Sequence, residues 1–97
     1  MIGPIHPGVT LSDDFMKPFG LSANGLSNVL GIPQNRVSDI VRGRRGITAD
    51  TALRLECAFG VSATFWLNLQ SHYELEVATR DAGDTIRSTV KSLVGAA

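Results

Sequence analysis

Residues 22–46 read SANGLSNVLGIPQNRVSDIVRGRRG and contain two short apolar repeats with a turn between them. Leu26 and Leu30 lie one helical turn apart, and Val37 and Ile40 form a second pair with helical spacing. The spacing therefore predicts two short helices, the second of which is followed at once by arginines.

The residues between the two pairs favour a sharp turn. Gly31 can adopt the left-handed backbone that ends a helix. Pro33 cannot continue that helix and suits the first turn of the next one, which we expect over residues 33–42. Ser27 is small where the two helices must approach closely. Together these features predict a helix-turn-helix, a unit that presents the outer face of its second helix to a DNA major groove.

The charge of the chain is balanced in total but not in distribution. Nine Lys and Arg residues face nine Asp and Glu residues, so the formal net charge is zero. Residues 36–45 nevertheless contain four arginines and a single acid, Asp39. A neutral protein with this local excess has one cationic face, which indicates a binding surface.

If Val37 and Ile40 point inward, the polar residues between and before them point outward. Gln34 and Asn35 can each bond the N6/N7 edge of adenine, so we expect them to read bases. Two roles are open for Asp39: it can accept from a cytosine amine, or it can orient a neighbouring arginine. The outward set predicted to face DNA is Gln34, Asn35, Ser38 and Asp39, with Arg36 and Arg42 at its flanks.

Phosphate contacts are expected beside this face. Arg42, Arg44 and Arg45 are placed for phosphates, although Arg44 or Arg45 can instead enter a minor groove. The helix that Ser22 is expected to cap offers free amides to a further phosphate. The alternative is a solvated charge cluster on a plain helical hairpin. The coincidence of apolar pairs, turn glycine, small residue and arginines favours DNA binding.

Apolar spacing and capping residues predict further helices on both sides of this unit. We expect them at residues 8–17, from a Thr48 cap to Phe59, and from a Ser62 cap to about Arg80. Residues 81–84 interrupt the apolar pattern, and a weak sixth helix follows around Ile86 and Val90. The chain is therefore predicted to be all-α, with residues 1–7 as an N-terminal arm, residues 8–80 as the DNA-binding domain and residues 81–97 as a tail.

One apolar stripe runs along the fifth expected helix. Its members recur at intervals of three and four residues: Trp66, Leu69, Tyr73 and Val77. A chain of 97 residues has little interior for the whole stripe, so we expect this helix to form a homodimer interface. The alternative is that the stripe closes the monomer core, and a mixture of the two, with Trp66 in the core, is also open.

Few residues are suited to other chemistry. Cys57 is the sole cysteine, which excludes an internal disulfide, and we expect a partly buried core residue there. His6 and His72 lack metal-ligand spacing to Cys57, so we expect no metal site. No catalytic constellation is present, so we expect no enzymatic activity and no cofactor. Without a membrane-length apolar run or a signal peptide, we expect a soluble cytoplasmic protein.

Three longer motifs carry a family resemblance. They are IHPG at residues 5–8, GIPQNRVSDIVRGRRGITADTALRL at residues 31–55 and FGVSATFWLNLQSHYELEVA at residues 59–78. Together they resemble the HigA-type antitoxins, a branch of the lambda-repressor-like (XRE) helix-turn-helix family, and the likeness covers residues 4–80. RGITADTA at residues 45–52 and FWLNLQ at residues 65–70 are distinctive, because a generic helix-turn-helix lacks both.

The resemblance implies a five-helix lambda-repressor-like domain that binds double-stranded operator DNA as a homodimer and represses its own operon. It also implies a HigB-like, mRNA-cleaving toxin partner that is neutralised by complex formation. The family's groove-facing positions are occupied here by Gln34, Asn35, Ser38 and Asp39. The chain departs from the commoner pattern at Gly25 and Ser27. The alternative is an orphan repressor of the same family without a toxin.

Overall fold

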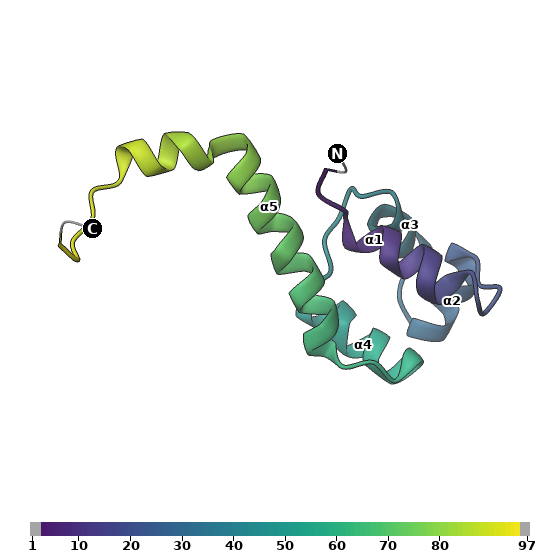
Figure 1. The fold of residues 1–97 in the computed structure, drawn as a ribbon. Coiled ribbons are helices and arrows are strands. Elements are labelled where there is room, and N and C mark those ends of the chain that lie inside the picture. The colour runs from purple at the N-terminus through teal and green to yellow at the C-terminus, as the bar shows by residue number, and fades with distance from the viewer. Residues whose placement is uncertain (1–2, 96–97) are drawn as a thin grey trace.

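The computed structural model describes residues 3–95, which form helices joined by short turns (Figure 1). The helical segments are α1 (Pro7–Thr10), η1 (Leu11–Met16), α2 (Ala23–Leu30), α3 (Gln34–Val41), α4 (Ala49–Phe59) and α5 (Ala63–Thr89). No strand occurs within this range, so the all-α prediction is confirmed. Residues 1–2 of the expected arm and residues 96–97 of the expected tail lie outside the described residues.

The first helix begins at Pro7 and changes character halfway along. His6 precedes it in extended backbone, and its Nδ1 accepts a hydrogen bond of 2.9 Å from the Gly8 amide. In η1 the turns are wider, because the Lys17 amide donates to the carbonyl of Ser12, five residues earlier. The helix expected at residues 8–17 is therefore confirmed, with a π-helical second half that periodicity did not predict.

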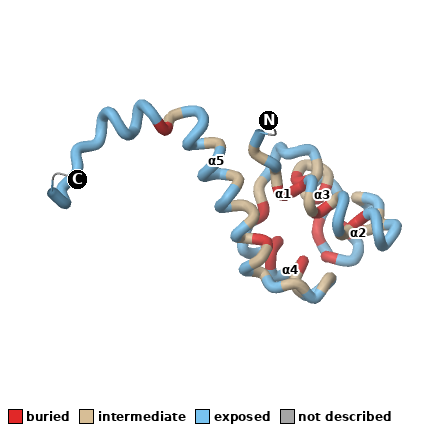
Figure 2. The backbone as a smooth tube through the Cα atoms, in the orientation of Figure 1, coloured by how far each residue is buried: buried red, intermediate tan, exposed pale blue. Residues whose placement is uncertain are grey.

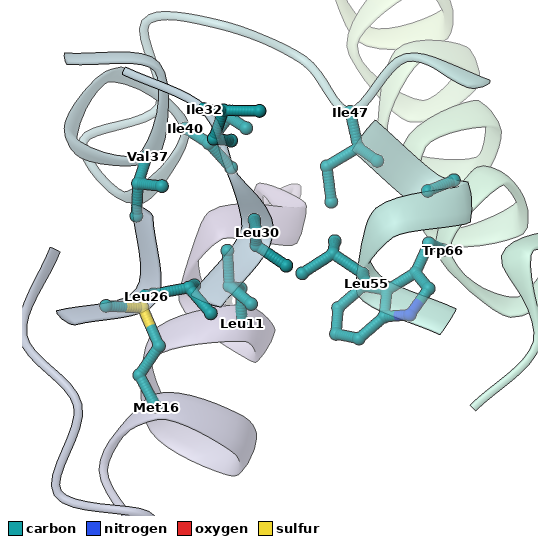
Figure 3. Packing of buried hydrophobic residues seen from close by; sticks show 11 residues of the cluster. Leu11, Met16, Leu26, Leu30, Ile32, Val37, Ile40, Ile47, Leu55 and Trp66 are labelled. Atoms are coloured by element: carbon teal, nitrogen blue, oxygen red, sulfur yellow. The ribbon is translucent and has the colours of Figure 1, made fainter. Parts of the chain in front are cut away.

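The core lies where η1, α2, α3 and α4 meet the first turns of α5. Figure 3 shows Leu30 and Leu55 reaching toward each other between α2 and α4, with Trp66 beside Leu55. Leu55 and Trp66 are fully buried, and burying each such side chain stabilises the fold by about 1.5–3 kcal/mol. The remaining apolar members are Leu11, Met16, Leu26, Ile32, Val37, Ile40, Ile47 and Ala52.

Three helices begin at the hydroxyl caps that the sequence predicts. The hydroxyl of Ser22 accepts from the Gly25 amide at 3.0 Å, and that of Thr48 from the Thr51 amide at 3.4 Å. The Ser62 hydroxyl accepts from the amide of Phe65 at 3.2 Å. Each cap satisfies a first-turn donor that has no partner within its helix, which fixes where the helix starts.

Helix α5 corrects the expectation for the C-terminal part. It runs without a break for 27 residues, so the interruption at residues 81–84 and the separate sixth helix are both wrong. The reason is that the outer half contacts no core, so nothing imposes an apolar period on its sequence. Asp84 pairs with Arg87 one turn later at 3.2 Å, and such pairs support an exposed helix. The helix thus crosses the boundary expected between residues 80 and 81.

The outer half of α5 projects from the globular part and is almost wholly exposed (Figures 1 and 2). The molecule therefore measures 54 × 25 × 22 Å, with a radius of gyration of 16.7 Å. A compact domain of this length has a radius of gyration of about 12.5 Å. Within residues 3–95 no helix is both long enough and apolar enough to cross a membrane.

The structure also corrects the prediction for Cys57, which is exposed and not a partly buried core residue. The inward face of α4 carries Ala52, Leu55 and, half-buried, Phe59. Cys57 follows Leu55 by two residues, which turns it about 200° around the helix, away from that face.

Candidate nucleic-acid interface

The turn between α2 and α3 has the geometry that the sequence predicts. Gly31 ends α2 with φ 69° and ψ 37°, the left-handed conformation that an L side chain would strain. Ser27 is buried, and its hydroxyl donates to the Asn24 carbonyl at 2.7 Å. Arg54 of α4 donates to the Leu30 carbonyl at 2.9 Å, which satisfies a carbonyl at the end of α2. The two helices are therefore held in one fixed arrangement.

Helix α3 has one buried and one open face. Val37 and Ile40 are each 1% exposed, so the inward placement expected from their spacing is confirmed. The polar residues of the other face line one shallow hollow on the surface: Gln34, Asn35, Ser38, Asp39 and Arg42. This face offers amide, hydroxyl, carboxylate and guanidinium groups, which can bond the edges of base pairs.

Arg36 lies at the edge of α3 and is paired within the protein. Its Nη1 lies 3.2 Å from Asp50 Oδ1 of α4, and the same oxygen accepts from Arg54 Nε at 2.8 Å. The Arg54 hydrogen bond, with a smaller contribution from Arg36, lowers the pKa of Asp50 below its ordinary value. The DNA contact predicted for Arg36 therefore competes with an intramolecular ion pair.

The other three arginines extend from the segment that links α3 to α4. We call residues 42–47 the basic loop. Arg42, Arg44 and Arg45 are exposed, and no carboxylate among residues 3–95 lies within ion-pair distance of them. The Asp39 carbonyl accepts from the amides of Arg44 at 2.8 Å and Arg45 at 3.2 Å, which folds the loop back on the end of α3. Their charges are therefore available beside the open face.

Two residues that the sequence analysis did not assign to this site contact the basic loop. The His6 ring lies against Gly43, and Gln70 Oε1 of α5 accepts from the Ile47 amide at 2.8 Å. Gln70 is 23 residues from Ile47, and His6 is farther still from Gly43 in sequence. No local spacing signals such contacts.

The residues predicted for a dimer interface divide into two groups. Trp66 is fully buried in the monomer, with its ring centroid 4.6 Å from that of Phe15, so its assignment to an interface is wrong. Trp66 belongs to the core because α5 begins beside α4 and η1. Leu69, Tyr73 and Val77 are half-buried and keep part of their surface open. Their role at an interface remains a prediction.

Metal-binding geometry is not found in the described part of the chain. Within residues 3–95 no three His, Cys, Asp or Glu side chains gather closely enough to hold an ion. His72 instead lies 3.0 Å from Glu76, one turn further along α5.

Comparison of the sequence with known proteins identifies the family of the chain. Residues 14–66 match the family described as Helix-turn-helix. The chain is 51% identical over 77 residues to virulence-associated protein I of Dichelobacter nodosus, covering 79% of this chain and 71% of that one. It is 33% identical over 72 residues to antitoxin HigA-1 of Vibrio cholerae, covering 74% and 68%.

Solved structures agree with this assignment. Pseudomonas aeruginosa antitoxin HigA with the higBA promoter superposes with a TM-score of 0.90 at 44% identity, covering 94% of this chain and 99% of that one. Antitoxin GraA in complex with its operator gives a TM-score of 0.90 at 41% identity, covering 97% and 95%. The chain therefore belongs to the helix-turn-helix family and, within it, to the HigA-type antitoxins.

Proposed function

We propose that this protein is a DNA-binding antitoxin that represses its own operon and neutralises an mRNA-cleaving toxin by complex formation. The observation that carries the DNA-binding part is the open polar face of α3 beside Arg42, Arg44 and Arg45, which no carboxylate of residues 3–95 neutralises. Support for the antitoxin part comes from relatives named as HigA and GraA antitoxins, two of which were solved with promoter or operator DNA.

In this proposal α3 enters the major groove with its open face toward the bases. Gln34 and Asn35 stand at its N-terminal end, where recognition helices make base contacts. Arg42 and Arg44, at the other end, bind phosphates of the backbone, while the first turn of α2 meets a phosphate through its amides.

A homodimer completes the site, because one short helix makes too few contacts for useful specificity. Two copies related by a twofold axis can read half-sites about 34 Å apart on one face of the duplex. We assign the interface to α5, where Leu69, Tyr73 and Val77 keep part of their surface open. Leu75 and Ile86 are 67% and 51% exposed there, on a helix that extends away from its own domain. Apolar groups on such a projection are typical of an interface.

Operator binding tests the base readers. Gln34→Ala or Asn35→Ala should weaken binding of the natural operator by about 1–3 kcal/mol and relax preference at one base pair. Asn68→Ala is the matched control, because Asn68 is an exposed amide on α5 and does not line the open face of α3. Fluorescence anisotropy with single-base operator variants measures both effects. Equal losses for all three variants would contradict the assignment.

Salt dependence tests the phosphate contacts. Arg44→Ala should weaken binding to all sequences and lower the slope of log K against log salt by about 1. Lys91→Ala removes one positive charge from an exposed position after the end of α5 and should leave the slope unchanged. An unchanged slope for Arg44→Ala would remove Arg44 from the phosphate contacts.

Co-expression tests the toxin partner. The product of the neighbouring reading frame should arrest growth when expressed alone, and co-expression of this chain should restore it. If no adjacent product is toxic, the protein is an orphan repressor and only the DNA-binding part of the proposal stands.

A further inference from the structure

The basic loop carries the phosphate-binding charges but has little structure of its own. Its residues connect α3 to α4 without a helix, and Arg42, Arg44 and Arg45 are exposed. A free loop would lose conformational entropy on binding DNA, whereas a loop already held in place has lost it on folding. What holds the loop therefore affects how well it binds.

His6 joins three elements at the loop. Its Nδ1 accepts from the Gly8 amide at the start of α1. Its ring lies beside Gly43 of the basic loop, so that a Cβ added to Gly43 would lie 3.7 Å from the ring. On its other side it packs edge-on against Tyr73 of α5, with ring centroids 4.9 Å apart. One side chain thus contacts α1, the basic loop and α5.

Gln70 holds the other end of the loop. Its Oε1 accepts from the Ile47 amide at 2.8 Å, while its Nε2 donates to Glu74 at 3.0 Å, which orients the amide group. The same amide packs directly on Gly46, where a Cβ would lie 2.8 Å from Nε2. Ile47 itself is buried in the core. The loop is therefore fixed to α5 at one end by Gln70 and at the other through His6 and Tyr73.

We propose that His6 and Gln70 are positioning residues for operator binding, which hold the basic loop in its phosphate-contacting conformation and fasten it to α5. This inference rests on the proposed DNA-binding function. Through Gln70 and Tyr73, and not through its other residues, α5 is thereby coupled to the basic loop, which follows any movement of the helix at these two positions.

Two variants separate positioning from folding. His6→Asn retains a side-chain acceptor that can cap the Gly8 amide but removes the ring from Gly43 and Tyr73. Gln70→Met fills similar space but offers no strong acceptor to the Ile47 amide. Ser71→Ala is the matched control, because Ser71 is the exposed neighbour of Gln70 on α5.

Operator affinity is measured by anisotropy over a range of salt concentrations, with thermal unfolding recorded for each variant. His6→Asn and Gln70→Met should each weaken operator binding about tenfold. A loss of this size matches the conformational entropy of about one loop residue that must become ordered when DNA binds. Their salt slope should fall toward that of Arg44→Ala, a change that loss of stability alone does not produce. Hydrogen exchange of the Ile47 amide should accelerate in Gln70→Met, while that of the Leu26 amide in α2 should not.

The outcomes distinguish the two proposals. If the wild-type protein binds operator and both variants bind with the same affinity and slope, the positioning role is refuted and the proposed function stands. If His6→Asn binds as the wild type does, His6 acts only as a helix cap. If the wild-type protein does not bind operator DNA, the proposed function fails and the positioning role fails with it.

Discussion

Two glycine-to-alanine substitutions should change stability in opposite directions. Gly8 of α1 lies directly on the backbone of α3. A Cβ at Gly8 would overlap the Ile40 carbonyl oxygen and lie 2.8 Å from its carbon and 3.0 Å from the Val41 Cα, where ordinary contacts begin at 3.4 Å. Backbone cannot rotate aside as a side chain can, so α1 and α3 must separate.

The cost of Gly8→Ala follows from that overlap. Overpacking of a well-filled interior costs about 1–3 kcal/mol, and a clash with backbone belongs at the upper end. For a domain of this size about 3 kcal/mol corresponds to a fall in Tm of roughly 12–24 °C. Because α3 carries the open polar face, the variant should also bind operator more weakly at temperatures where it remains folded.

Gly25→Ala is the control, since it makes the same chemical change inside α2. A Cβ there would meet Leu21 and the Ser22 hydroxyl at 3.4 Å, an ordinary contact distance. Alanine in a helix interior is favoured over glycine by about 0.5–1 kcal/mol, which should raise Tm by roughly 2–8 °C. Circular dichroism during heating and urea titration measures both variants. A Gly8→Ala protein as stable as the wild type would refute the close approach of α1 and α3.

Three further predictions concern pH, capping and the core. Burial lowers the pKa of His6 below its ordinary value of 6.5, so below that pH the unfolded chain binds a proton there more readily than the folded one. The free energy of unfolding should therefore fall as pH drops below about 6.5, and pH-dependent urea midpoints should show a smaller fall in His6→Asn. Arg54→Ala should cost about 1 kcal/mol by urea unfolding, because the Leu30 carbonyl loses its donor, and Arg54→Lys should not restore it fully. Leu55→Ala should cost about 2–5 kcal/mol in the same assay, whereas Cys57→Ala on the exposed face should change stability by less than about 0.5 kcal/mol.

The local part of the fold could be predicted from the sequence because its causes are local. A hydroxyl cap acts on an amide three residues away, as at Ser22 and Ser62, and an apolar pair such as Val37 and Ile40 marks one face of one helix. The end of α2 was predictable from Gly31 alone, because it depends on the left-handed conformation of that one residue. These features determined the placement of α2 and α3, and hence the open face.

The rest depends on contacts between distant parts of the chain or on the absence of a core. The contacts of His6 with Gly43 and of Gln70 with Ile47 exist only once α5 has packed against the loop. The outer half of α5 has no core beside it, so the loss of apolar periodicity at residues 81–84 does not mark the end of the helix. The burial of Trp66 likewise depends on where α5 begins relative to η1, which spacing along one helix does not determine.

The buried indole of Trp66 supplies an intrinsic optical probe of folding. It is the sole tryptophan of the chain, fully enclosed, with no hydrogen-bond partner for its Nε1 among residues 3–95. Its emission should therefore lie at short wavelength in the folded state and shift to the red when solvent reaches the ring. Since the indole lies in the interior and not on α3, unlabelled protein can report its own unfolding during a titration with DNA, without direct quenching by the bases.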